Sequence, residues 1–387
     1  MKVFQAMFEY LCSFLHGEPV ASNLKLLNED ALDKLLSFAK KHDLAHLMTE
    51  ALEYNGVLPE NSEIKKQYIK ERNLAVYRYE QMNYEFKEIC GLLEVEKIPF
   101  IPLKGAIIRG FYPEPWMRTS CDIDILVRGE DIQKSADIIK EKLGYTRGNL
   151  GDHDISMFAP SGGHLEMHYH LVTPTAKAEE VAVFEKVWSE GARARDPLGY
   201  RYDMSEEYLY CYHISHLVKH LRCGGSGIRT VLDTWILNNR VEYDAQKRDA
   251  LLAEAGLLRA ARAIERLAEI WFSKAESDAL SEMLGEYIVT GGVYGSFENR
   301  VAMQQAKKRG KISYLLSRFF LPYEEMKFKY PTLQKWPILY PFYIVKRMFL
   351  LFNKETKERV TNEFNQTVSG DEEKKKNVVK LLNELEL

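Results

Sequence analysis

The first hundred residues place apolar side chains at helical spacing. Leu32, Leu35, Leu36 and Ala39 recur every three to four positions, behind Asn28-Glu29-Asp30, a run that favours a helix start. A longer helical stretch follows over residues 63–95. Its larger aromatic side chains are expected to pack inside the protein: Tyr68, Tyr77, Tyr84 and Phe86. The pattern predicts a helical region over residues 1–96.

At Lys97 the period of the pattern changes from helical to strand-like. Short apolar runs bounded by glycine, proline or charge predict several strands, and an amphipathic stretch over residues 131–143, closed by Gly144, predicts a helix between them. A small α/β domain is therefore expected over residues 97–204. The predicted strands cover Ile98 to Leu103, Cys121 to Val127, Ile155 to Ala159 and His164 to Val172, the last two joined by a turn over residues 160–163.

Helical spacing returns near Ser205. A helix over residues 206–221, a glycine-rich joint over 224–227 and a helix over 228–239 predict a helical pair, with more helices to about residue 290. We expect a helical domain over 205–300 that closes a cleft, and a basic, aromatic region over 301–387. The fold class predicted is α+β, with a small sheet domain embedded between helical amino-terminal and carboxyl-terminal regions.

Composition narrows the classes of protein. The 387 residues are 46% hydrophobic, with a formal net charge of −3, which excludes disordered and collagen-like chains and gives no global attraction to nucleic acid. The five cysteines are scattered, which argues against a disulfide framework or a zinc ribbon. The longest uncharged apolar stretch, Trp336 to Val345, is too short to span a bilayer. We expect a cytoplasmic protein with no signal peptide and no integral membrane insertion.

Acidic side chains gather on two of the predicted strands. Because side chains alternate along a strand, Asp122 and Asp124 share one face, opposite the apolar Ile123 and Ile125. The same rule places Glu166 on one face of the later strand, together with His164, His168 and His170. Paired carboxylates repel each other unless a cation neutralises them, and Mg²⁺ prefers such oxygen ligands. Two alternatives remain open: an ordinary exposed strand face, and a zinc site built from the histidines.

These residues carry a resemblance to a known family. Lys104-Gly105, Arg118, the Asp122-x-Asp124 strand and Glu166-x-His168, taken in this order, resemble the DNA polymerase beta-like nucleotidyltransferase superfamily. Within it, the sequence is most similar to a bacterial group of uncharacterised nucleotidyltransferases. The similarity is strongest from Ile98 to Val172. The Gly-Ser usual at the superfamily's helix start is Lys-Gly here.

The resemblance implies a small mixed sheet flanked by helices, with Asp122, Asp124 and Glu166 as catalytic residues that bind Mg²⁺ or Mn²⁺. An NTP would be the substrate. Helix amino termini favour phosphate, so the helix after Gly105 is expected to hold the triphosphate with the help of Lys104 and Arg118. The remaining nucleotide-contacting or acceptor-contacting side chains are expected to come from His168 and from the helical region, namely His213, His216 and Arg229.

The predicted function is metal-dependent transfer of an NMP from an NTP to an acceptor hydroxyl, with release of pyrophosphate. The acceptor is open among RNA, protein and small molecules. The alternative is a catalytically silent nucleotidyltransferase fold used for nucleotide sensing or protein interaction. For the basic region, packing against the rest of the chain is expected, with two alternatives: single-stranded nucleic acid binding through Lys307, Lys308, Arg309, Lys311, Tyr314, Phe319 and Phe320, and an interfacial membrane patch through Trp336, Tyr340, Phe342, Tyr343, Lys346 and Arg347.

Overall fold

The computed structural model describes residues 3–21, 27–173, 176–293, 295, 299–300, 323, 326, 330, 332–349 and 372–387. These residues belong to two compact units. The first comprises residues 1–217 and 227–281, and the second comprises residues 218–226 and 282–387. Within the described residues, no helix has the length and apolar character needed to cross a bilayer.

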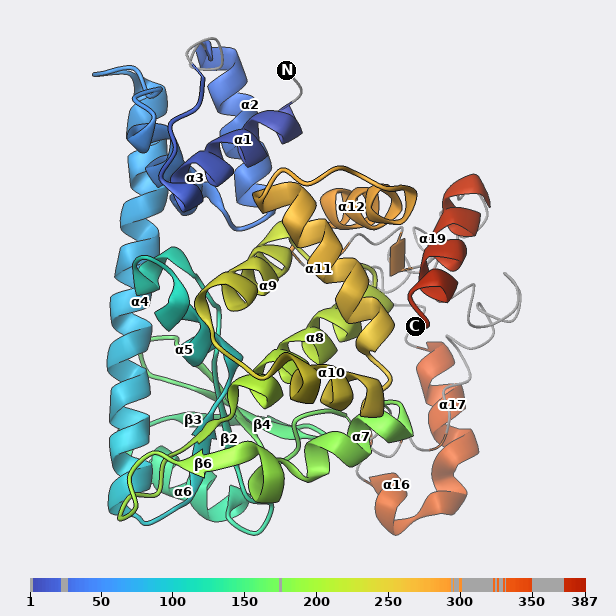
Figure 1. Ribbon diagram of the computed structural model, residues 1–387. Helices are drawn as coiled ribbons and strands as arrows, with labels where there is room; N and C mark the ends of the chain where they lie inside the picture. Colours follow the sequence, from blue (N-terminus) through green and yellow to red (C-terminus); the bar gives the residue numbers. More distant parts are fainter. Residues whose placement is uncertain are drawn as a thin grey trace. The chain divides into compact units, whose positions relative to one another are not determined.

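The first unit begins with the predicted helices (Figure 1). Asn28 caps the second of them by accepting a hydrogen bond from Ala31 N, as its position before an apolar face suggests. All four apolar positions expected to form that face are buried. The amino-terminal helices are α1 (Val3–His16), α2 (Glu29–Lys41), α3 (Ala45–Tyr54) and α4 (Glu63–Val95).

Helix α4 is 33 residues long, begins after the Ser62 cap and covers the predicted range. It packs against α3 near one end and against the sheet domain near the other (Figure 1). Tyr68 is fully buried, as expected, but Tyr77 and Tyr84 are 66% and 63% exposed, so the prediction that they pack inside is wrong. A helix this long presents a solvent side along its whole length, and aromatic residues on that side are not buried.

The sheet of the first unit has five strands in the order β1-β2-β5-β4-β3. Strands β2 and β5 are parallel neighbours, and the other pairs are antiparallel, so the sheet is mixed, as expected. The outermost strand β3 was not predicted, because its polar sequence lacks the alternation of a half-buried strand. The strands are β1 (Phe100–Pro102), β2 (Ile123–Val127), β3 (Thr146–Leu150), β4 (Asp154–Phe158) and β5 (His164–His168).

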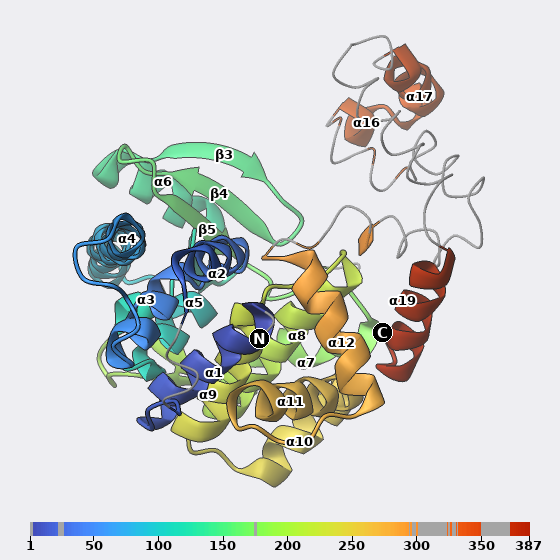
Figure 2. The ribbon, with the colours of Figure 1, turned by 90° about the horizontal axis from the view of Figure 1, so that it is seen from above.

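One face of the sheet forms the hydrophobic core of the domain. Helix α6 (Ile132–Leu143) ends at Gly144, whose φ of +72° explains the glycine, and packs with α4 on this face. Figure 2 shows α6 beside the curved strands β3 and β4. The apolar side chains of the strands meet those of the two helices here, including Ile125, Met157, Met167, Ile89 and Ile139. The alternate residues of β2 and β5 therefore lie on the opposite face.

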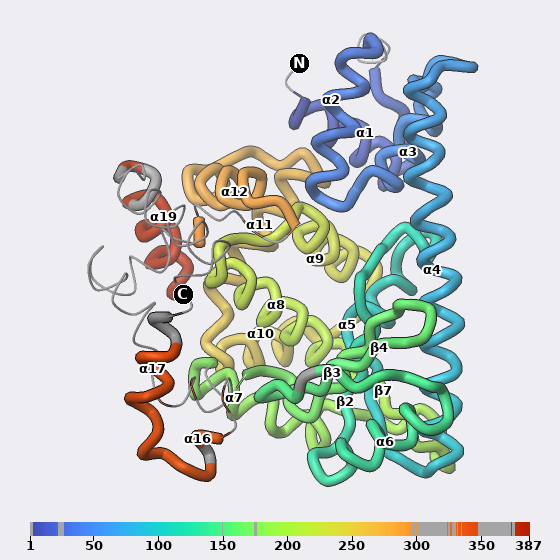
Figure 3. Tube along the Cα trace, turned by 180° about the vertical axis from the view of Figure 1, so that it is seen from behind, coloured from blue at the N-terminus to red at the C-terminus, as the bar shows by residue number. Residues whose placement is uncertain are grey.

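Short elements connect the sheet to the later helices. Helix α5 (Lys104–Ile108) leads into the 3₁₀ turns η2 (Arg109–Phe111) and η3 (Pro115–Met117). After β5 come α7 (Ala178–Glu185), the π-helical turn η4 (Val187–Gly191) and a two-stranded sheet of β6 (Ala192–Ala194) and β7 (Tyr202–Met204). The helices α8 (Glu206–Arg222), α9 (Ile228–Arg240), α10 (Ala245–Glu254) and α11 (Leu258–Phe272) follow; Figure 3 traces their path.

In the second unit the glycine-rich joint forms a tight turn. Gly224 and Gly225 have φ of +118° and +127°, and a Cβ added to Gly225 would lie 3.3 Å from the Cα of Gly295. The glycines thus allow backbone segments to approach closely, which is a packing role. Most of helix α12 and the helices α16 (Thr332–Lys335), η5 (Pro337–Leu339), α17 (Tyr340–Phe349) and α19 (Glu372–Glu384) also belong to this unit; α12 spans Ala279–Gly291.

The basic, aromatic region is described only in part. The residues on which the alternative of nucleic acid binding rested lie outside the described residues: Lys307, Lys308, Arg309, Lys311, Tyr314, Phe319 and Phe320. Trp336 and Phe342 are 61% and 62% exposed, so the packing expected for the region is not observed for these two side chains.

Candidate active site

The acidic residues of β2 and β5 meet on the polar face of the sheet. The parallel register places Asp124 beside Glu166 and Leu126 beside His168. The other face of both strands is apolar and packs in the core, which fixes this register. A slip of one residue would move each of these polar side chains to the core face. The strand pairing therefore brings together carboxylates that are 42 positions apart in the chain, as the sequence suggested.

Three side chains form a compact group of potential metal ligands. Ligand atoms of Asp124, Glu166 and His168 all lie within 4.8 Å of one another. His168 Nε2 is 3.1 Å from Asp124 Oδ1 and 3.7 Å from Glu166 Oε2. The alternative of a three-histidine zinc site is not seen among the described residues, because His168 is the histidine in this group, whereas His164 stacks on Phe158 and His170 follows the end of β5.

Two buried polar atoms of the group have no hydrogen-bond partner among the residues that the structure describes. They are Asp124 Oδ2 and His168 Nδ1, and both residues are about 5% exposed or less. Buried polar atoms are nearly always paired, because leaving one unpaired costs about 1–3 kcal/mol. A carboxylate oxygen that accepts no hydrogen bond and lies beside a second carboxylate is suited to coordinate a cation.

Burial and neighbouring charges shift the pKa values of the three carboxyl groups in different directions. Burial on its own would raise the pKa of Asp124, but Lys104 and the hydrogen bond from His168 hold that pKa well below its usual range. Burial, followed by repulsion from Asp124, raises the pKa of Asp122 and of Glu166. Asp124 is thus a fixed anion, while the other two have the higher proton affinity that suits a group that accepts a proton.

Asp122 lies just before β2 and is half-buried. It is not part of the compact ligand group, although its charge interacts with Asp124, Glu166 and Lys104. The structure therefore places the three predicted acids in one electrostatic cluster and brings His168, rather than Asp122, into ligand distance of the other two.

Lys104 and Gly105 lie at the start of α5, next to the acids. Lys104 Nζ is 3.7 Å from Asp124 Oδ2 and 5.8 Å from the ring centroid of Tyr212. Helix α5 has only five residues and continues into the 3₁₀ turn η2, so its dipole is much smaller than that of the full helix expected from the sequence. Lys104 is consequently the main positive charge on this side of Asp124.

Arg118 has a protein carboxylate as its partner. Its Nε and Nη2 donate to Asp233 Oδ1 and Oδ2, each at 2.9 Å, and Tyr112 Oη donates to Asp233 Oδ1 at 2.8 Å. The two-pronged contact expected with a phosphate is thus made with α9 of the same chain. Arg118 Nη1 still faces the start of α5, because a Cβ added to Gly105 would lie 3.6 Å from it.

Helix α8 contributes a residue that sequence reasoning missed. Tyr212 is 2% exposed, and burial together with the charges of Asp124, Glu166 and Asp122 raises its pKa well above the usual range. The ring therefore lies against the acidic cluster. No local pattern marks Tyr212, since it is one aromatic residue among several on a buried helix, and its neighbourhood depends on the packing of α8 against the sheet.

The polar residues expected to line a cleft are mostly bonded within the protein. His213 Nε2 is 2.9 Å from Thr234 Oγ1, and Arg229 donates to Asp43 and to the Thr119 carbonyl oxygen. Neighbouring segments thus supply partners to His213 and Arg229, and their contact with a nucleotide or acceptor stays a prediction. His216 is half-buried on α8.

One known protein family matches the sequence of the chain, including the region of the acidic cluster. A family described as uncharacterised nucleotidyltransferase has a sequence model that matches residues 28–273, which include every residue of the acidic cluster. No curated protein and no solved structure matches the chain at a significant level.

Proposed function

Because the chain belongs to the uncharacterised nucleotidyltransferase family, we propose that it transfers an NMP from an NTP to an acceptor hydroxyl in a metal-dependent reaction. The observation that carries the proposal is the group of Asp124, Glu166 and His168, with ligand atoms within 4.8 Å of one another and Lys104 beside it. Such a grouping is costly for a protein unless a cation and a phosphate use it.

The residues present fit a divalent cation. Asp124 Oδ2 is buried and accepts no hydrogen bond from the described part of the chain, and Glu166 supplies a second carboxylate. Oxygen donors suit Mg²⁺ and Mn²⁺, and an imidazole among them is better tolerated by Mn²⁺. We propose Asp124, Glu166 and Asp122 as the residues that hold the ion. When bound, a divalent cation neutralises phosphate charge and makes the α-phosphorus more electrophilic.

Glu166 is the proposed general base. Its raised pKa and partial exposure on the strand face suit proton acceptance from an incoming hydroxyl. The hydroxyl O–H bond breaks and its proton passes to Glu166. The oxygen forms a bond to the α-phosphorus, and the bond from that phosphorus to the β-phosphate oxygen breaks, so that pyrophosphate leaves with the bonding electron pair.

Other residues orient the reactants in this proposal. Lys104 and Gly105 border the triphosphate, with Lys104 as the positive charge that is nearest to Asp124. His168 holds Asp124 through its Nε2 contact, and Arg118 supports the start of α5 from its bond with Asp233. His216, half-buried on α8, is proposed to contact the nucleotide.

The silent-module alternative receives no specific support. The acidic residues are all present, and within the described residues Asp124 keeps one oxygen that accepts no hydrogen bond, which a protein using the fold only as a scaffold does not require. Membership of the wider DNA polymerase beta-like superfamily, a cytoplasmic location and the four predicted sequence regions belong to the same proposal.

The proposal is tested by following label from each α-labelled NTP into RNA, protein and low-mass fractions of a cell extract, with Mg²⁺ or Mn²⁺. We expect transfer by the wild-type protein that EDTA abolishes. Asp124→Asn should lose transfer at least 100-fold, whereas Asp137→Asn, an exposed aspartate on α6, should not. Equal activity of the two variants, or label in no fraction with either metal, would contradict the proposal.

A further inference from the structure

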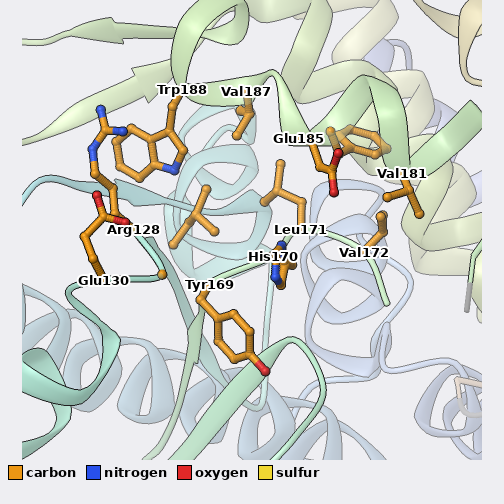
Figure 4. A pocket seen from close by; sticks show the side chains of 13 residues that line it. Arg128, Glu130, Tyr169, His170, Leu171, Val172, Val181, Glu185, Val187 and Trp188 are labelled. Atoms are coloured by element: carbon orange, nitrogen blue, oxygen red, sulfur yellow. The ribbon is translucent and has the colours of Figure 1, made fainter. Parts of the chain in front are cut away.

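A pocket of about 310 Å³ opens at the carboxyl ends of the two parallel strands. Leu126 of β2, residues 169–172 after β5, and parts of α7 and η4 line it. Figure 4 shows Arg128, Glu130 and Trp188 on one side of it and Val181 and Glu185 on the other. This volume is at the lower end of the range for small-molecule sites. The function proposed above does not use the pocket.

The pocket adjoins the acidic cluster. Leu126 pairs with His168 and lies two residues beyond Asp124, on the same face of β2. Two residues of strand span about 7 Å, so the pocket wall begins one residue pair past the cluster. On the other side, the ring of Phe184, a lining residue, is 5.8 Å from that of Tyr212, which lies against the acids.

The position of the pocket suits the acceptor and not the triphosphate. Lys104 and Gly105 follow β1, which borders β2 on one side, whereas Glu166 and His168 belong to β5 on the other side. The pocket follows the carboxyl ends of β2 and β5, and its lining residues 169–172 come directly after the strand that carries the proposed base Glu166. A hydroxyl must lie within hydrogen-bond reach of its base, so a molecule held here is on the correct side of the cluster.

The lining selects for a class of molecule. Its walls are mainly aliphatic and aromatic, and its ionisable side chains are two carboxylates, Glu130 and Glu185, the guanidinium of Arg128 and the imidazole of His170. Arg128 lies over the Trp188 ring, with Cζ 4.6 Å from the centroid. The carboxylates outnumber the guanidinium, and the wall at Leu126 adjoins the acids of β2 and β5, which disfavours a polyanion such as an RNA end and favours a cation.

We propose that this pocket binds the acceptor, and that the acceptor is a small organic cation with an apolar body and a hydroxyl group. This inference rests on the function proposed above and makes its acceptor specific. In the transfer step the hydroxyl loses its proton to Glu166, its oxygen bonds to the α-phosphorus, and pyrophosphate leaves with the electrons of the broken P–O bond.

Two substitutions on α7 test the pocket, each with a matched control. Val181→Trp places a large side chain at a half-buried lining position, and Ala182→Trp places it at the next, exposed position. Glu185→Gln removes a lining charge, and Glu179→Gln removes an exposed charge from the same helix, away from the lining. Binding of each labelled NTP with Mn²⁺ is measured by equilibrium dialysis, separately from transfer.

The transfer assay uses a deproteinised low-mass extract divided by cation exchange into cationic and unretained pools, with total RNA and total protein in parallel. We expect label in the cationic pool. Val181→Trp should lower that transfer at least tenfold with NTP binding retained, and Glu185→Gln should raise the acceptor KM several-fold. Both controls should behave as the wild type.

Failure of the pocket and failure of the proposed function give different results. Label in RNA, protein or the unretained pool, or undiminished transfer by Val181→Trp, overturns the acceptor pocket and leaves nucleotidyl transfer standing. Wild-type protein that binds no NTP, or that labels no pool, overturns the proposed function and the acceptor pocket with it.

Discussion

Arg118 and Asp233 join two segments 115 positions apart by two parallel hydrogen bonds of 2.9 Å, from Nε to Oδ1 and from Nη2 to Oδ2. Both side chains are buried, at 5% and 0% exposure. The pair fastens α9 to the segment that leads into β2, and Arg118 Nη1 continues toward Gly105. The acidic strand is therefore held from the side of the later helices as well as by the sheet.

The pair is expected to be essential to stability. Asp233→Ala leaves the Arg118 guanidinium buried without its counter-charge and removes the acceptor of Tyr112 Oη. Breaking a buried pair in this way typically costs about 3–5 kcal/mol. Urea unfolding measures the loss. The control is Glu254→Ala, which breaks the exposed Lys186–Glu254 pair and should cost less than about 1 kcal/mol. Similar losses for both variants would contradict this assignment.

Substitutions of Asp122 and Asp124 are expected to change the stability of the metal-free protein differently. Asp124→Asn removes the charge that Lys104 and His168 compensate, so it should lower stability by about 1–3 kcal/mol. Asp122→Asn relieves repulsion from Asp124 and should leave stability unchanged or raise it by up to about 1 kcal/mol. Thermal unfolding in EDTA compares them, and both variants should lose transfer. If Asp122→Asn destabilised the protein more than Asp124→Asn does, repulsion from Asp124 would not be the main interaction of Asp122.

Substitution of Lys104 is expected to affect mainly NTP binding, and substitution of Glu166 mainly the chemical step. Lys104→Ala removes the cation beside Asp124 and should raise the KM for NTP about tenfold, with a smaller change in kcat. Glu166→Gln keeps the shape of the side chain but cannot accept the proton, so kcat should fall roughly 10²–10⁴-fold. Steady-state kinetics with NTP binding by dialysis distinguishes the two. If Glu166→Gln mainly weakened NTP binding, its role as base would be refuted.

His213 is expected to make stability depend on pH in mild acid. Burial lowers the pKa of His213 to about 4, and unfolding returns it to about 6.5. The unfolded chain then binds the extra proton, so stability falls as the pH decreases from about 6.5 toward 4, by roughly 3 kcal/mol in total. Urea unfolding at several pH values should show a shallower decrease for His213→Asn than for the wild type. Parallel curves would mean that His213 does not titrate on unfolding.

Local pattern was sufficient for most of the elements. The bounds of α4 match the prediction, Asn28 caps α2, and Gly144 ends α6, because each depends on residues within a few positions of one another. The strands β3, β6 and β7 were missed. They are short or polar, and neighbouring strands stabilise them through backbone hydrogen bonds that no side-chain pattern reveals.

The site was predictable where strand alternation determines it. Side chains alternate along a strand, which places Asp122 with Asp124 on one face and Glu166 with His168 on one face. The parallel pairing of β2 and β5 then brings the two sets together. The partners of Arg118 and Arg229 were not predictable. Asp233 and Asp43 are 115 and 186 positions away from them, and only the packing of the helices brings these carboxylates to the guanidinium groups.

The parallel pairing of β2 with β5 also has a consequence for biosynthesis. The ribosome completes Asp124 44 residues before His168, and Arg118 115 residues before Asp233. Until β5 has been made, β2 can pair only with β1, and its carboxylates lack the neighbouring strand that carries Glu166 and His168. A nascent chain that stops before α9 carries the entire acidic cluster but leaves Arg118 without its counter-charge. The acidic cluster is therefore complete in sequence once His168 has been made, whereas the counter-charge that holds the segment before β2 arrives only with α9.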